Sequence, residues 1–214
     1  MTPRFAQSVD PLFLYVLDLL DRLGRGEKPS PQDERLRIRA LLDQAEAVVG
    51  AGPEWESAKY ALVSWIDEVL VDTPWDGRNW WSNNVLEVEY FGTRVCFEEF
   101  YLRAQEATTL ARRDALEVYY ICVVLGFRGL YRDPGMAETL VQGHGLPPNI
   151  DSWAKQATMS IRLGQKRPAL SGARHEIAGA PPLRARPFLV WSWWAACMLA
   201  AVNLFVFVWF WSRS

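Results

Sequence analysis

The stretch YALVSWIDEVLVDTPW, residues 60 to 75, decides the fold of this chain. On a helix drawn through it, Leu62 and Trp65 share one side, while Ile66 and Leu70 cover other sides. A helix that is apolar on most of its faces is usually enclosed by its neighbours. We therefore predict that this segment is a central, largely buried helix.

Three carboxylates interrupt the apolar segment: Asp67, Glu68 and Asp72. Taking an ionised group out of water costs several kcal/mol unless hydrogen bonds or opposite charges replace the water. One interpretation is an internal ion-pair cluster with Arg128 and Arg132, which end a second apolar segment. The other is a groove whose acids bind a partner protein. The sequence leaves both interpretations open.

A groove of this kind would also include Trp75, which follows the acids at the end of the segment. Catalysis is the weakest interpretation, because Asp67 and Glu68 are adjacent and adjacent helix residues point about 100° apart. The chain has no HExxH, GxSxG, P-loop or dinucleotide-binding motif. Its three cysteines fit no zinc-site spacing. We predict that the protein is not an enzyme and binds no cofactor or metal.

Helix signals dominate residues 1 to 163, and no alternating strand pattern occurs. A helix capped by Asp10, with Pro11 in its first turn, is expected to end at Gly24, and 74–81 are expected to form a loop. Phe97 is expected to face inward. The other predicted helices are 31–49, 53–73, 84–90, 95–105, 112–125, 136–141 and 150–163. The predicted class is all-α.

Residues 187 to 211 form the longest apolar run, with 25 residues and no charge. About 20 helical residues cross the apolar core of a bilayer, so this run is predicted to be a transmembrane helix. Residues 164 to 186 are expected to form a flexible basic linker rich in Gly, Pro and Ala, and 212 to 214 a short periplasmic tail. The first residues lack the apolar segment of a signal peptide, so we expect none. We expect a tail-anchored protein of the bacterial inner membrane, with residues 1 to 186 in the cytoplasm.

Within the predicted span, Ser192, Ala196, Ala200 and Asn203 form one stripe of small or weakly polar residues. Small residues allow close helix approach, and an Asn in lipid seeks a hydrogen bond. We expect the stripe to pack against another transmembrane helix, either a second copy or a partner subunit.

The charge of the chain is unevenly distributed. Residues 1 to 161 contain 16 Lys/Arg and 24 Asp/Glu, whereas residues 162 to 186 contain six basic residues and one acid. The acidic body argues against nucleic-acid binding, which requires a cationic surface. The basic segment adjoins the predicted span, where Lys and Arg are attracted to anionic lipids.

Several motifs occur in an order that resembles one known family. They are YALVSWIDEVLVDTPW, LEVEYFGT, FEEFY and ALEVYYICVVLGFRGLYRDP, spread over residues 60 to 134. The chain resembles the DotU/TssL (IcmH-like) family, subunits of the type VI secretion system and of the related type IVB system. The family's acidic pair maps onto Asp67 and Glu68. The resemblance extends over residues 5 to 163 and the C-terminal anchor.

This resemblance implies a cytoplasmic domain of two packed small helical bundles, shaped like a hook, on one transmembrane helix. It implies partnership with a TssM (IcmF-like) membrane subunit, an indirect link to a TssJ-like lipoprotein, and docking of the baseplate. Independently of the resemblance, we expect self-association. A type IVB subunit, a lone tail-anchored receptor and a membrane-bound enzyme remain as alternatives.

Overall fold

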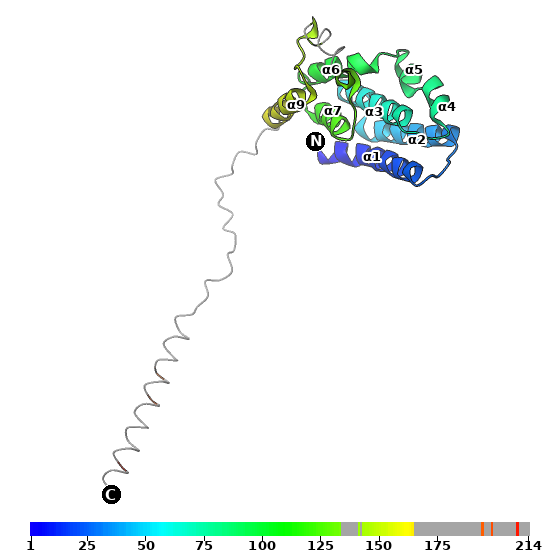
Figure 1. Ribbon diagram of the computed structural model, residues 1–214. Helices are drawn as coiled ribbons and strands as arrows, with labels where there is room; N and C mark the ends of the chain where they lie inside the picture. The colour runs from blue at the N-terminus through cyan, green and yellow to red at the C-terminus, as the bar shows by residue number, and fades with distance from the viewer. Residues whose placement is uncertain (134–140, 142, 165–193, 195–197, 199–208, 210–214) are drawn as a thin grey trace. The chain divides into compact units, whose positions relative to one another are not determined.

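The computed structural model describes residues 1–133, 141 and 143–164, and the single positions 194, 198 and 209 (Figure 1). Among these residues the regular elements are all helical, which confirms the predicted all-α class. The elements are α1 (Pro3–Gly24), α2 (Pro31–Val49), α3 (Pro53–Asp72), α4 (Arg78–Asn83), α5 (Leu86–Phe91), α6 (Cys96–Ala107), α7 (Asp114–Val124), the 3-10 helix η1 (Gly129–Arg132) and α9 (Ile150–Gly164).

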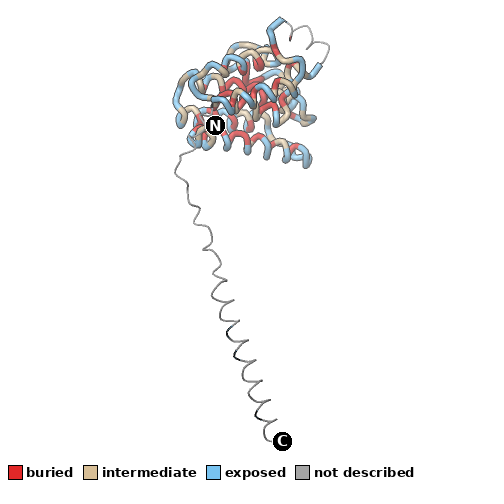
Figure 2. The backbone as a smooth tube through the Cα atoms, turned by 90° about the vertical axis from the view of Figure 1, so that its left-hand side faces the viewer, coloured by how far each residue is buried: buried red, intermediate tan, exposed pale blue. Residues whose placement is uncertain are grey.

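Helix α3 is the central element of the domain, as predicted. It packs against α4, α5, α6 and α7, and also contacts α2. Trp55, Tyr60 and Trp65 are fully buried along it, and the ring of Trp65 lies 5.2 Å from that of Phe13 in α1. The buried residues accordingly lie mostly in the middle of the domain (Figure 2). Any side chain on α3 therefore lies close to several other helices.

The first helix begins earlier than predicted, at Pro3, so the expected cap at Asp10 is wrong. Pro11 lies inside the helix, although it cannot donate a backbone hydrogen bond. The early turns bury Phe5 and Val9 on the same face as Leu12. Burying two such side chains contributes about 3–6 kcal/mol, enough to offset a proline that costs about 3 kcal/mol.

The expectation of a loop over 74–81 is also wrong in part, because α4 starts at Arg78. Its Trp81 is fully buried and donates a hydrogen bond to Asp67 in α3. This contact between distant segments stabilises a helix that local sequence does not specify. In α6, Phe97 is 39% exposed rather than inward, and it lines a pocket.

Residues Met1–Lys166 form one compact unit. Among the described residues, no helix combines the length and apolar character that crossing a bilayer requires. The predicted span, 187–211, falls outside the described residues except at 194, 198 and 209. The expected helix 136–141 also falls outside them, except at 141. The four residues of the stripe, Ser192, Ala196, Ala200 and Asn203, all fall outside them.

Candidate functional site: an acid-lined pocket beside the central helix

Asp67 is buried, and its carboxylate caps α5 from a distance. The backbone N–H groups of Leu86 and Glu87 donate to it at 2.9 and 2.8 Å, and the indole Nε1 of Trp81 donates at 2.9 Å. The first N–H groups of a helix lack partners within that helix, and Val85, at the N-cap position, has no side chain that could accept them. Asp67 therefore fixes both α4 and the start of α5 against α3.

Burial raises the pKa of Asp67 to about 6, and its three hydrogen-bond donors oppose the rise. The side chain of Asp67 faces these donors, and the residue is only 3% exposed. The partner-groove interpretation required this carboxylate to contact a partner protein directly, and the burial of Asp67 does not support such contact. Asp67 instead shapes the wall against which a partner could bind.

Glu68 performs a similar capping role toward η1. Its carboxylate accepts the backbone N–H of Arg128 at 2.6 Å and that of Gly129 at 3.0 Å, where η1 begins. It also lies 2.8 Å from the guanidinium of Arg132. Gly129 has a positive φ of 46°, and a Cβ there would collide with the ring of Phe127, so the tight turn into η1 requires glycine.

Asp72 is the most accessible of the three acids. Its two oxygens pair with the two terminal nitrogens of Arg132, one at 2.7 Å, and both side chains are nearly half exposed. The hydrogen bonds to Asp72 raise the pKa of Arg132 above its ordinary value. Arg132 thus bridges Asp72 and Glu68, whereas the side chain of Arg128 donates to the carbonyl oxygens of Val123 and Phe127.

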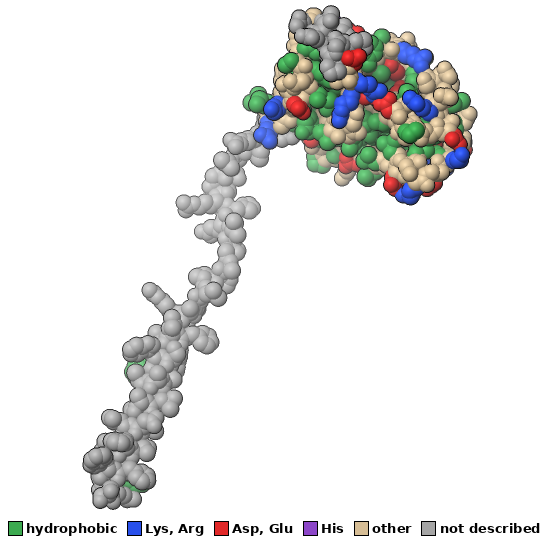
Figure 3. Space-filling view, in the orientation of Figure 1, with side chains coloured by type: hydrophobic (Ala, Val, Ile, Leu, Met, Phe, Trp, Pro, Cys, Tyr) green, Lys and Arg blue, Asp and Glu red, His purple; other side chains and the backbone are tan. Residues whose placement is uncertain are grey.

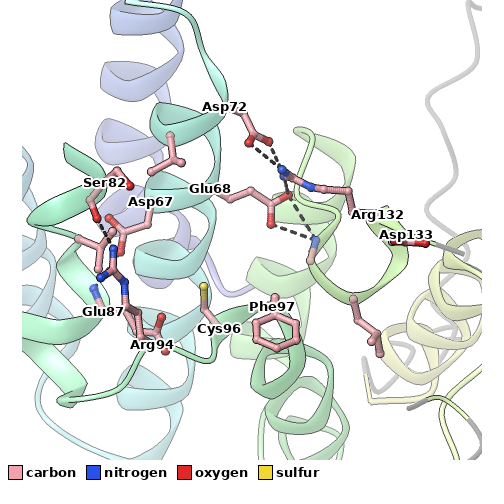
Figure 4. A pocket seen from close by; sticks show the side chains of 14 residues that line it. Asp67, Glu68, Asp72, Ser82, Glu87, Arg94, Cys96, Phe97, Arg132 and Asp133 are labelled. Carbon is pink, nitrogen blue, oxygen red and sulfur yellow. Dashed lines mark hydrogen bonds and ion pairs between the residues drawn. The ribbon is translucent and has the colours of Figure 1, made fainter. Parts of the chain in front are cut away.

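These acids border a pocket of about 360 Å³ between α3, the α4–α5 segment, α6 and η1 (Figure 4). Asp67, Glu87 and Arg94 lie on one side of the pocket, and Glu68, Asp72 and Arg132 lie on the other, with apolar side chains between them. The lining residues are Asp67, Glu68, Val71, Asp72, Ser82, Val85, Glu87, Arg94, Cys96, Phe97, Gly129, Leu130, Arg132 and Asp133. The pocket can accommodate an apolar side chain together with a charged group.

Sequence reasoning missed Glu87, which holds the loop on one side of this pocket. Glu87 is buried and accepts hydrogen bonds from the hydroxyl groups of Tyr60 and Thr93 and from the backbone N–H of Val95. Glu87 is an acidic residue in the short motif LEVEYFGT, and nothing in that motif indicates that its side chain is buried. Trp75, in contrast, does not line the pocket: it is half-buried and its indole donates to the carbonyl of Leu70.

The arrangement offers little for catalysis. Burial raises the pKa of the Cys96 thiol, so this cysteine is not a ready nucleophile. Asp67 and Glu68 face different elements, and each is occupied by backbone donors. Within the part of the chain that the structure describes, no group of three or more potential metal ligands occurs.

The sequence model of the type VI secretion system protein DotU matches residues 4–213, almost the whole chain. The chain belongs to the DotU family. The fold is similar to that of the cytoplasmic domain of TssL from Acinetobacter baumannii, with a TM-score of 0.58 and 23% identity over 77% of this chain and 100% of that one. No curated protein matches the chain.

Membership of the DotU family identifies the chain as a subunit of the type VI secretion membrane complex and not as an enzyme. The family is an inner-membrane component of that system with a cytoplasmic domain. The alternative of a membrane-bound enzyme built on Asp67, Glu68 or Asp72 is therefore abandoned.

Proposed function

We propose that this chain is a docking subunit, whose acid-lined pocket receives a segment of a baseplate protein. The observation that carries the proposal is the half-exposed pairing of Asp72 with Arg132 beside apolar pocket walls. A partner could bury an apolar side chain in the pocket and present a basic group to Asp72. Polar groups at the edge of an apolar site are the usual source of orientation and specificity.

Arg132 is the internal competitor for that basic group. Exposed ion pairs contribute only about 0–1 kcal/mol, so separating Arg132 from Asp72 costs the domain little. Glu68 would retain its backbone donors at Arg128 and Gly129 while Arg132 moves. The pocket could therefore exchange an internal cation for an external one without disturbing α3 or η1.

The test compares two charge reversals in the full-length chain. Asp72→Arg should weaken binding to the purified baseplate of the same system by about tenfold or more, since a charge-assisted hydrogen bond contributes about 1.5–3 kcal/mol. Asp76→Arg is the matched control, because Asp76 also forms an exposed ion pair, with Lys28, but does not line the pocket. Equal binding by the two variants would contradict docking through the pocket.

We propose that residues 187–211 anchor the chain in the inner membrane as a single transmembrane helix, with the N-terminal domain in the cytoplasm and the C-terminus in the periplasm. Trp194, Met198 and Trp209, the described positions in this segment, all carry exposed apolar side chains, as lipid contact would require. The partners proposed for this span are a TssM (IcmF-like) subunit or a second copy of this chain, with Ser192, Ala196, Ala200 and Asn203 at the interface. A TssJ-like lipoprotein would be linked indirectly.

The competing proposals differ in the partners they require. A lone tail-anchored receptor should purify from membranes without a TssM-like subunit, whereas a docking subunit should bring that subunit with it. The family matched here is that of the type VI system, which favours it over type IVB export.

A further inference from the structure

Helix α9, the last described helix of the domain, has two faces of different character. Trp153, Ala157 and Ile161 are buried against the rest of the domain, in part against α7. On the opposite side, Met159 is 65% exposed and Leu163 is 86% exposed. Met159 and Leu163 lie one turn apart, so together they present apolar surface to the solvent.

Basic side chains flank these apolar residues. Lys155 and Arg162 are exposed on the same side of α9 as Met159. Arg25 and Lys28 pair with acids, whereas none of the ion pairs among the described residues includes Lys155 or Arg162. Hydrophobic and basic side chains adjoin one another over α9, at the left edge of the domain in Figure 3.

A surface hollow of about 450 Å³ lies at this face, between Tyr120 of α7 and Lys155, Met159 and Arg162 of α9. Asp151 also borders it. An aromatic side chain, a thioether and two cations around one hollow match the chemistry of a phospholipid, whose phosphate is anionic and whose chains are apolar. Helices with basic and apolar residues on one exposed side bind lipid surfaces in this way.

The position of α9 in the chain limits its distance from the proposed membrane anchor. The helix ends at Gly164, and 22 residues separate it from the apolar segment that begins at Pro187. Even when fully extended at about 3.3–3.6 Å per residue, these residues span at most about 80 Å. The residues from 162 to 186 include six basic residues and one acid, so the whole region favours an anionic surface. Tethering makes the encounter intramolecular, and a weak surface affinity then suffices.

We propose that the exposed face of α9, formed by Lys155, Met159, Arg162 and Leu163, binds anionic phospholipids of the membrane in which the chain is anchored. This inference rests on the proposed membrane anchor and adds a second contact with the bilayer. That contact would restrict the orientation of the domain, and so the direction in which the pocket beside α3 opens.

The test uses the full-length chain in vesicles that carry nitroxide-labelled lipids, with or without phosphatidylglycerol. A fluorescent dye is attached at Met159→Cys or, as the matched control, at Leu14→Cys on α1, a position of nearly equal exposure at 67%. Cys96 and Cys197 are replaced by Ala, and Cys122 remains because it is fully buried. We expect stronger lipid quenching at position 159, increasing with phosphatidylglycerol and decreasing with salt.

A second comparison tests the charges. With the dye at position 159, the double variant Lys155→Gln/Arg162→Gln should bind the membrane surface with an equilibrium constant about 30-fold lower. This factor corresponds to a loss of about 1 kcal/mol for each basic residue removed. Arg25→Gln with Arg37→Gln removes the same charge from exposed positions elsewhere and should leave the constant unchanged. Equal effects of the two pairs would overturn the proposal.

The outcomes separate this inference from the proposed anchor. Failure of the chain to float with vesicles would contradict the anchor itself. If the chain floats, but the dyes at positions 159 and 14 are quenched equally, the anchor stands and the α9 proposal is overturned. A dye at position 159 that is shielded from water but not quenched by lipid would indicate coverage by protein, such as a second copy, and would also overturn the proposal.

Discussion

Replacing Asp67 with Asn should destabilise the domain although the two side chains have nearly the same shape. The carboxylate accepts three buried donors, from Trp81, Leu86 and Glu87. An amide has only one oxygen, so its NH₂ group must face at least one of these donors. An unsatisfied buried donor costs about 1–3 kcal/mol. For a domain of this size that loss lowers Tm by about 3–10 °C.

The assay is thermal unfolding followed by far-ultraviolet circular dichroism at pH 8, where Asp67 is ionised in the native state. Hydrogen exchange adds a local measurement, because the amides of Leu86 and Glu87 should lose protection first. Asp72→Asn is the control, since Asp72 belongs to an exposed ion pair that contributes about 0–1 kcal/mol. If Asp67→Asn and Asp72→Asn unfold at the same temperature, distant capping by Asp67 does not stabilise the domain.

Three further predictions concern pH, the η1 turn and the anchor. Between about pH 4 and pH 6, the native state holds a proton on Asp67 that the unfolded chain releases. The unfolding free energy should therefore fall by up to about 3 kcal/mol as the pH rises through this range. Urea titrations of Asp67→Asn should lack this contribution. Glu68→Gln should lower stability by about 1–3 kcal/mol and speed exchange at Gly129, and unchanged exchange there would contradict its capping role. Ala200→Leu with Asn203→Leu should weaken co-purification of membrane partners while carbonate extraction still finds the chain inserted, whereas undiminished co-purification would exclude the stripe as an interface.

The central helix was predictable because its signal is local. Residues 53–73 combine a proline at the start with apolar side chains on most faces, and the structure places a buried helix at Pro53–Asp72. The need for partners was equally predictable, since ionised acids in an enclosed helix must be satisfied. The pairing of Arg132 with Glu68 and Asp72 follows that reasoning.

The identity of the other partners was not predictable, because they are backbone groups far along the chain. Nothing near Asp67 indicates that it accepts the first N–H groups of a helix beginning at Leu86, since local patterns do not report which helix ends meet in space. The same limit explains α4, where buried Trp81 outweighs turn-forming residues. Pro11 suggested that a helix starts there, but the apolar face that begins at Phe5 is the stronger indication of where the helix starts.

The acids of α3 cap elements that are synthesised much later. Glu54 accepts the N–H of Ala115 at 3.1 Å at the start of α7, and Glu68 accepts those of Arg128 and Gly129, about sixty residues after it. The six-residue α5 depends on Asp67 in the same way. A nascent chain that has not yet emerged past Arg132 therefore lacks one side of the pocket, so the proposed docking site is completed only late in synthesis.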